Sequence, residues 1–321
     1  MKEKLYDKIY EKLQMPIKIY LNNETKKLLE HDCESFDIKN KNLFYNTLVS
    51  NYIGDYVKHL ENEGKQILEI MQDLIINGNK DDFPSIARKI AYKNATSEDI
   101  KEHGDYISLR INLKNIDLIA DAIASTNENI KVSIFFRNLF LDYLSLPIYR
   151  REQIIYIDQY NKIIKAINEG LKISYWNKNK HKSHNLSVYS IKQSGLEYHN
   201  YVIGSRDNKT GASSIKLSSI GTVRLLNEKA TFNDTFKECY KVMKENGCQF
   251  GVDLIKYHKV YLTDEDIKTY NNRYLDRPII YKKGVHEKGK FYIFNCSRFQ
   301  LEGYFNPFKH LIEIEEAKSI T

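Results

Sequence analysis

The chain has 321 residues, of which 42% are hydrophobic and 28% charged, an ordinary balance for a soluble protein of two or three domains. No run approaches the ~18 apolar residues of a membrane span, and the start, MKEKLYDKIYEKLQ, has no apolar stretch typical of a signal peptide. The four cysteines lack CxxC spacing, which predicts reduced thiols in a cytoplasmic protein and argues against a disulfide framework or a zinc ribbon.

The net charge of +7 is concentrated in the middle of the chain. Residues 151–229 hold 13 Lys and Arg against 6 Asp and Glu. By comparison, residues 1–150 hold 21 against 23, and residues 230–321 hold 15 against 13. A basic segment of this kind favours an anionic partner.

An internal repeat occupies the first part of the chain. Residues 17–53 align without gaps on residues 109–145 at an offset of 92, with Ile19 facing Ile111 among the identical pairs. Each copy predicts a short strand, here residues 17–21 and 109–113, followed by two helices. A lone strand leaves its backbone groups unpaired, so we expect the two strands to pair with each other.

This strand–helix–helix repeat resembles the ribbon-helix-helix fold, here as a pseudo-dimer within one chain. The resemblance implies that the two-stranded ribbon enters the DNA major groove and that the N-termini of the second helices bind phosphate. On the outer face of the ribbon it places Lys18, Tyr20, Arg110 and Asn112. At the helix N-termini it places Asn40, Lys41, Asn42, Lys131 and Ser133. The alternative is a helical scaffold that does not contact DNA, which the slightly acidic charge of residues 1–150 favours.

After Pro147 the pattern becomes mostly extended. Residues 154–169 are apolar at helical spacing and end at Gly170, a typical helix stop. Strand-like runs then follow, separated by polar turns: LKISYW, NLSVYSI, EYHNYVIGS and SSIKLSSIGTVRLL. Short strands at even spacing predict a small antiparallel barrel.

These runs resemble a WYL domain, the Sm- or SH3-like β-barrel of bacterial regulators, over about residues 155–230. The order of the family is kept: an opening helix, a strand ending in Tyr175, the core VYSIKQSGLEYHNYVIG, and a closing strand IKLSSIGTV. The Trp-Tyr-Leu tripeptide that names the family falls on Asn200-Tyr201-Val202. The usual Arg-Leu-Asp-Arg-Ile of the closing strand reads Lys-Leu-Ser-Ser-Ile from Lys216.

The resemblance implies a concave polar surface that receives nucleic acid or a charged small ligand. The matching positions are Tyr175, Tyr189, Ser190, His199, Tyr201, Arg206 and Lys216. Arg206 and Lys216 would neutralise phosphate, aromatic rings would stack on unpaired bases, and the loop lysines would attract anions. The alternative is that Tyr175 and Tyr201 belong to the barrel core and that the lysines form a solvated surface.

The expected fold class is therefore α+β with three domains. Residues 1–150 form the mainly helical tandem ribbon-helix-helix-like domain and residues 151–230 the WYL barrel. Residues 231–321 resemble the α/β extension that follows WYL domains in related regulators, which implies a role in forming homodimers.

No pattern of catalytic residues is found. His181 and His184 have i, i+3 spacing but lie in a Lys/Asn-rich loop without a cysteine or carboxylate partner, which argues against a metal site. Nucleophile elbows and glycine-rich phosphate loops are absent from the sequence. We therefore expect no enzyme activity and no cofactor.

The leading hypothesis is a nucleic-acid-binding regulator. One version is a transcription regulator that reads duplex DNA through the ribbon. The other is an accessory factor that binds single-stranded RNA, similar to the WYL proteins that accompany type VI-D CRISPR effectors. The expected partners are nucleic acid, a second copy of the chain and a CRISPR effector protein, with no membrane. The alternative function is a small-molecule or nucleotide sensor that acts through a protein partner without contacting nucleic acid.

Overall fold

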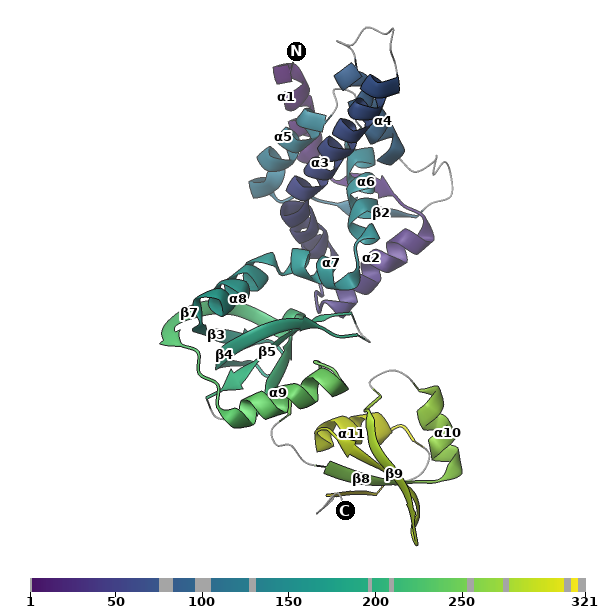
Figure 1. Cartoon of the computed structure of the whole chain (residues 1–321). Coiled ribbons are helices and arrows are strands. Elements are labelled where there is room, and N and C mark those ends of the chain that lie inside the picture. Colours follow the sequence, from purple (N-terminus) through teal and green to yellow (C-terminus); the bar gives the residue numbers. More distant parts are fainter. Residues whose placement is uncertain are drawn as a thin grey trace. The chain divides into compact units, whose positions relative to one another are not determined.

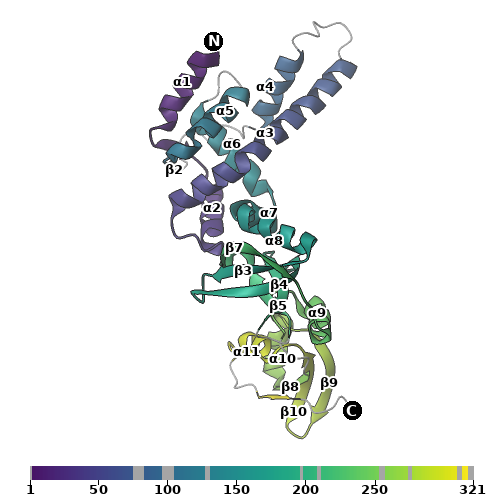
Figure 2. The same cartoon turned by 90° about the vertical axis from the view of Figure 1, so that its left-hand side faces the viewer.

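The computed structural model describes residues 2–74, 83–95, 105–126, 131–195, 198–207, 211–252, 257–273, 277–308 and 313–316 (Figures 1 and 2). The fold is α+β, with three antiparallel sheets in the described residues. The chain forms two compact units, Met1–Ile155 and Tyr156–Thr321. None of the helices described is both long enough and apolar enough to cross a bilayer.

The first unit is mainly helical around a two-stranded ribbon. Its elements are α1 (Lys2–Leu13), β1 (Ile17–Tyr20), α2 (Asn23–Ser35), α3 (Lys41–Leu74), α4 (Phe83–Ala95), β2 (Tyr106–Leu109), the short 3-10 helix η2 (Leu113–Asn115), α5 (Ile116–Thr126), α6 (Val132–Ser145) and α7 (Ile148–Ile155). Strands β1 and β2 pair antiparallel, so the strand of the first copy pairs with a strand that ends at Leu109, the first residue of the second copy. The repeated phenylalanines Phe44 and Phe136 are both fully buried. Tyr45 of the first copy and Phe140 of the second have ring centroids 5.8 Å apart, so the two copies share one core.

The second strand of the ribbon lies earlier in the chain than the sequence predicted. Strand β2 ends at Leu109, and the prediction of a strand over residues 109–113 was wrong. The Asn42 side chain accepts a hydrogen bond from Arg110 N at 3.0 Å and donates to Arg110 O at 3.2 Å. Asn46 donates to the same Arg110 oxygen at 2.9 Å and accepts from Asn112 N at 2.8 Å. These side chains occupy the backbone groups that a longer strand would use in its ladder.

The second unit begins with a five-stranded sheet. Its elements are α8 (Ile157–Glu169), β3 (Leu171–Asn177), β4 (Lys182–Gln193), β5 (Asn200–Arg206), β6 (Ser213–Lys216), the 3-10 helix η3 (Leu217–Ser219), β7 (Ile220–Lys229) and α9 (Asp234–Asn246). Helix α8 ends at Gly170, whose φ of 62° is left-handed and suits glycine. Figure 1 shows α8 and α9 on opposite sides of this sheet. The strand order is β6-β5-β4-β3-β7, and no ladder among the described residues joins β6 to β7 to close it.

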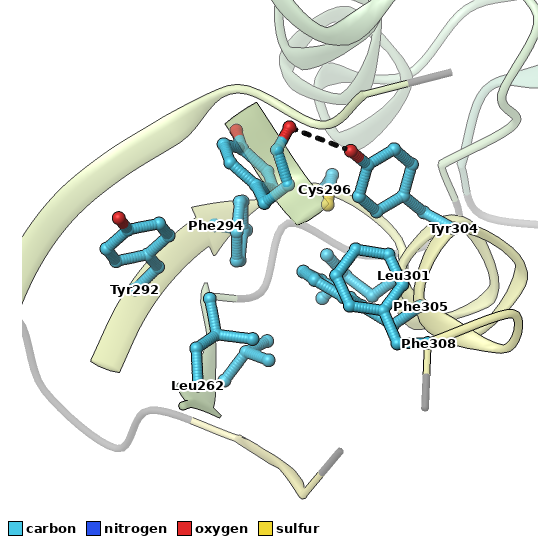
Figure 3. Close-up of a cluster of buried hydrophobic side chains, with 10 residues drawn as sticks. Leu262, Tyr292, Phe294, Cys296, Leu301, Tyr304, Phe305 and Phe308 are labelled. Carbon is cyan, nitrogen blue, oxygen red and sulfur yellow. Dashed lines mark hydrogen bonds between the residues drawn. The ribbon is translucent and has the colours of Figure 1, made fainter. Parts of the chain in front are cut away.

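The rest of the second unit is a four-stranded sheet with two helices. Its elements are β8 (Tyr257–Leu262), α10 (Asp264–Asn272), β9 (Ile280–His286), β10 (Gly289–Asn295), α11 (Arg298–Phe305) and β11 (Ile314–Glu316). The strand order is β11-β8-β10-β9. The core of this part joins Leu262 and Phe294 of the sheet to Leu301, Tyr304 and Phe305 of α11 (Figure 3).

Candidate nucleic-acid interface

Three polar side chains from neighbouring strands form a cluster on the five-stranded sheet. Tyr175 of β3 lies directly opposite His184 of β4, with ring centroids 5.8 Å apart. Arg206 of β5 donates a hydrogen bond from Nη2 to the Tyr175 hydroxyl at 2.8 Å. Ile203 packs against α9, and Arg206 lies three residues further along the same strand. Since successive side chains alternate, this cluster lies on the face opposite to α9.

The hydrogen-bonding capacity of the cluster is not filled. Among the described residues, Nε of Arg206 and Nε2 of His184 are buried without a hydrogen-bond partner. A buried polar group in this state costs about 1–3 kcal/mol, so such groups are typical of sites that receive a ligand. An acceptor such as a phosphate oxygen would satisfy the guanidinium.

The surroundings of the cluster are basic. Burial lowers the pKa of His184, and the positive charges of Arg206, Lys180 and Lys182 lower it further. Burial raises the pKa of the Tyr175 hydroxyl, while Arg206 opposes that rise. The imidazole is therefore neutral at pH 7 and the phenol remains protonated, so an approaching anion meets hydrogen-bonding groups beside a fixed guanidinium charge.

The lysines of the turn between β3 and β4 differ in what they contact. Lys178 donates from Nζ to the Tyr156 hydroxyl at 3.0 Å and to Ser218 O at 2.8 Å, and it lies over the Tyr156 ring at 4.4 Å. It therefore holds the turn in place. Lys180 and Lys182 are both exposed, and they extend the positive charge of the cluster into solvent.

The seven predicted barrel residues do not gather at one place. Tyr175 and Arg206 belong to the cluster, whereas Tyr201 is two residues from Ile203 and so lies on the α9 face. Lys216 pairs with Tyr201, and Ser190 pairs with Ile203, which puts both on the α9 face as well. His199 is buried just before β5.

A β-bulge at Tyr189 explains part of this division. The register of β4 against β5 shifts between Val188 and Ser190, so Tyr189 is the extra residue. Its ring packs against Phe236 at 5.3 Å and Tyr240 at 4.8 Å, both on α9. Tyr189 therefore helps to seat α9.

His184 belongs to this cluster, but sequence reasoning had considered it only as a metal ligand. The sequence signal that could have placed His184 in the cluster is its spacing of two and four residues from the buried Leu186 and Val188 along β4. Residues that share this spacing share a face of the strand.

The predicted DNA-contacting residues of the first unit are also divided. Lys18 and Tyr20 are exposed on β1, and their cross-strand neighbours Ser108 and Tyr106 are exposed on β2. Ser108 and Tyr106 were not predicted, because they lie outside the strand expected over residues 109–113. Lys18 Nζ lies over the Tyr106 ring at 5.1 Å.

The residues assigned to the second-helix N-termini and to the end of the ribbon are mostly engaged. Asn40 accepts from Leu43 N at 3.0 Å as a helix cap, and Lys41 binds Glu30 at 2.6 Å. Asn42 holds the backbone of Arg110, as described above. Arg110 and Asn112 lie after β2, Lys131 precedes α6, and Ser133 is in its first turn.

Comparison with known proteins shows the fold. No protein-family model and no curated protein match the sequence. Among solved structures the chain is similar to a CRISPR Cas-related protein, with 18% identity and a TM-score of 0.65 over 95% of this chain and 89% of that chain. At this identity the likeness shows a shared fold. Proteasome accessory factor B/C (PafBC) of Arthrobacter aurescens matches at 10% identity and a TM-score of 0.28, over 66% of this chain and 34% of that chain, which is too low to indicate one.

Proposed function

We propose that this chain is a non-enzymatic regulatory or accessory protein that binds single-stranded nucleic acid through the Tyr175–His184–Arg206 cluster of a WYL-type sheet. The observation that carries the proposal is the pair of buried side-chain nitrogens, Nε of Arg206 and Nε2 of His184, that have no hydrogen-bond partner among the described residues. A partly exposed guanidinium whose Nε has no partner suits a phosphate oxygen, and adjacent lysines raise the local concentration of anions.

The setting of the cluster supports this class of ligand. Residues 151–229 carry the excess positive charge of the chain, 13 Lys and Arg against 6 Asp and Glu. The fold likeness to a CRISPR Cas-related protein supports an accessory role in a nucleic-acid-directed system. The cytoplasm is the compartment we propose, since none of the four cysteines forms a disulfide among the described residues.

A second mode of binding is supported by the ribbon of the first unit. Strands β1 and β2 form a two-stranded antiparallel ribbon followed in each copy by two helices, as in the ribbon-helix-helix fold. Its exposed face carries Lys18, Tyr20, Tyr106 and Ser108. This face carries one lysine, so we expect its electrostatic attraction to duplex DNA to be weaker than the attraction of the Tyr175–His184–Arg206 cluster to a single strand.

Binding to labelled single-stranded RNA, single-stranded DNA and duplex DNA, measured by fluorescence anisotropy over a range of salt concentrations, tests the proposal. Arg206→Ala is expected to weaken single-strand binding by about tenfold or more, because a charge-assisted hydrogen bond is lost. It should also reduce the dependence of log affinity on log salt by about 0.7 for each phosphate contact removed.

Arg224→Ala is the matched control for this change. Arg224 is exposed on β7 and pairs with Ser174, so it lies on the opposite face from Tyr175 and its loss removes the same charge. We expect its affinity to stay within about twofold of wild type, since a distant surface charge contributes little at physiological salt. Absence of single-strand binding at low salt would overturn the proposal and favour a sensor that acts through a protein partner.

The affinity for single strands should also depend on pH through His184. The pKa of His184 is lowered in the free protein, so the ring is neutral at pH 7 and gains its proton only in acid. A bound phosphate favours the charged imidazolium, so affinity is expected to rise by up to about tenfold as the pH falls from about 7.5 to about 5.5. Anisotropy titrations at several pH values measure this rise. If the affinity of the His184→Gln variant rose with falling pH as much as that of wild type, the pH dependence would belong to other groups.

A further inference from the structure

The four-stranded sheet of the second unit has one covered face and one open face. The chain runs β8-α10-β9-β10-α11-β11 while the strand order is β11-β8-β10-β9, which is the split βαβ arrangement. The core cluster lies between the sheet and its helices and contains Val260 and Leu262 of β8 and Phe294 of β10 (Figure 3). The alternate residues of these strands therefore point to the other face.

That other face carries aromatic side chains on the two central strands. Phe291 of β10 lies directly opposite Tyr261 of β8, with ring centroids 6.2 Å apart. Tyr257 shares this face, and its ring lies 4.9 Å from that of Tyr281, which is 54% exposed on β9. Tyr257, Tyr261 and Phe291 are partly exposed. Partly exposed aromatic rings at adjacent positions of central strands are an arrangement on which unpaired bases can stack.

A glycine keeps the Phe291 ring extended across the sheet. Gly284 of β9 is the cross-strand neighbour of Phe291. A Cβ placed on Gly284 would clash with Cζ of that ring, so the ring occupies the space above the glycine. One ring face lies 4.7 Å from Nζ of Lys259, so it is covered by a flexible side chain and not by the core.

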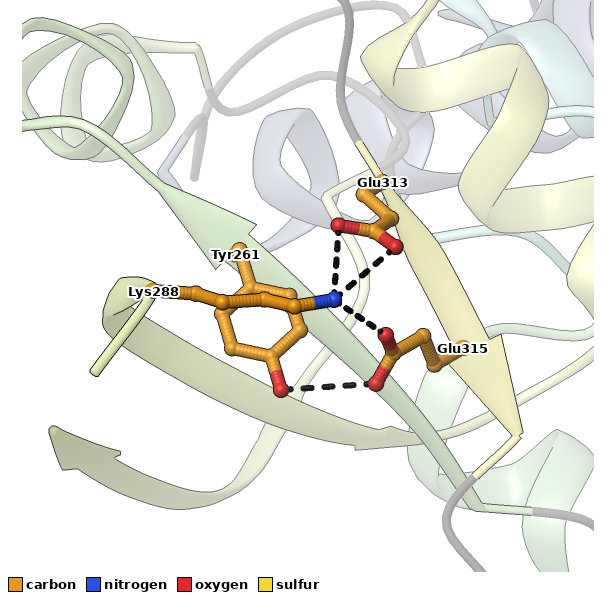
Figure 4. A network of polar contacts seen from close by, with 4 residues as sticks. All are labelled: Tyr261, Lys288, Glu313 and Glu315. Carbon is orange, nitrogen blue, oxygen red and sulfur yellow. Dashed lines mark hydrogen bonds and ion pairs between the residues drawn. The ribbon is translucent and has the colours of Figure 1, made fainter. Parts of the chain in front are cut away.

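The charges on this face are partly neutralised. Lys288 lies over the Tyr261 ring at 5.2 Å and forms ion pairs with Glu313 at 3.2 Å and Glu315 at 2.9 Å (Figure 4). Tyr261 donates from its hydroxyl to Glu315 at 3.3 Å. These carboxylates belong to the β11 side of the sheet.

Two other lysines on the same face keep their charge available. Lys259 of β8 lies next to Phe291 of β10, and Lys282 of β9 is the cross-strand neighbour of Ile293 of β10. Neither forms an ion pair with a described residue. Lys282 places its charge on the β9 side of the face, where exposed His286 ends the strand. Lys259 lies on β8 and is the cross-strand neighbour of Glu315 on β11.

We propose that this open face is a second binding site for single-stranded nucleic acid, in which bases stack on Phe291 and Tyr261 and the phosphates contact Lys259 and Lys282. The occupant follows from the combination of aromatic rings with unpaired ammonium groups, since stacking is tolerant of base identity and ammonium groups bind phosphate. The site is separate from the Tyr175–His184–Arg206 cluster. It shares the ligand class of the proposed function but is argued from its own residues.

Full-length variants that remove or keep the two rings test this site. Phe291→Ala and Tyr261→Ala are each expected to weaken binding of labelled uridine and thymidine decamers by about tenfold, because each removes one stacking partner. Phe291→Tyr and Tyr261→Phe keep a ring and are expected to bind within about twofold of wild type. Thermal unfolding of each variant checks that the sheet remains folded, which is expected because both rings are partly exposed.

Crosslinking of 5-iodouridine RNA, mapped by mass spectrometry, locates the contact independently. Crosslinks to peptides that contain Tyr261 or Phe291 are expected. If Phe291→Ala binds like wild type and crosslinks fall only within β3–β5, the second site is refuted while the proposed function stands. If Arg206→Ala binds like wild type and Phe291→Ala does not, the cluster is refuted and this site stands. If Phe291→Ala changes the molecular mass in light scattering but not the affinity, the face is a protein interface and the inference is overturned.

Discussion

Arg151→Ala is expected to destabilise the first unit by about 3–5 kcal/mol, because it leaves a buried carboxylate without its counter-charge. Arg151 of α7 donates from Nη1 to Oδ2 of Asp32 on α2 at 2.7 Å. Asp32 is 1% exposed and Arg151 is 7% exposed. The Arg151 guanidinium also lies 5.9 Å from the ring centre of Tyr143. The pair joins two helices far apart in the sequence, so its loss loosens α7 from α2.

Denaturant unfolding, with hydrogen exchange of α2 and α7 followed by mass spectrometry, measures this loss. Arg150→Ala is the matched control, because Arg150 is exposed and its side chain donates to Gln153, one turn along the same helix. It is expected to change stability by less than about 0.5 kcal/mol. The double change Asp32→Leu with Arg151→Met removes both charges and should recover most of the loss. A loss below about 1 kcal/mol for Arg151→Ala would show that Asp32 finds another partner.

Phe294→Ala is expected to cost about 3–5 kcal/mol in the second unit, since it opens a cavity in a closely packed aromatic core. Phe294 is fully buried between the four-stranded sheet and its helices. Its ring centroid lies 5.8 Å from that of Phe305 and 6.1 Å from that of Tyr270. Loss of this packing would release the sheet on which Tyr261 and Phe291 lie.

Phe299→Ala is the comparison for this change. Phe299 lies in the first turn of α11 and is 80% exposed, so the same truncation should cost less than about 0.5 kcal/mol. Thermal and denaturant unfolding of the two variants give the difference directly. If Phe294→Ala and Phe299→Ala lowered the free energy of unfolding equally, a cavity at Phe294 would not be the cause of the destabilisation.

Much of the first unit could be predicted from the sequence because its signals are local and repeated. The apolar period of two at Ile17 and Ile19, followed by helical periods, predicted strand–helix–helix in both copies. The same alternation runs on through Ile107, Leu109 and Ile111, so the pattern alone does not say where the second strand ends. The asparagine side chains on α3 decide that, because they bind the backbone just after Leu109.

The same contacts break the symmetry of the repeat. Asn138 stands where the offset of 92 places the counterpart of Asn46. The backbone that it would bind by symmetry lies at Lys18 and Tyr20, which are in the β1 ladder. Its amide atoms are buried without a hydrogen-bond partner among the described residues. A repeat in sequence therefore predicts elements but not their contacts.

By itself the sequence determined the kinds of elements, their order, the helix stop at Gly170 and the concentration of positive charge in the middle segment. These properties depend on periods, single residues and counts, which need no distant contact. The tertiary structure decided which side chains meet. Tyr175, His184 and Arg206 share a face because of cross-strand register, and the bulge at Tyr189 changes the phase of β4 further along. Likewise, Phe291 lies over Gly284 only because β9 and β10 pair in that register, which is a long-range property of the folded sheet.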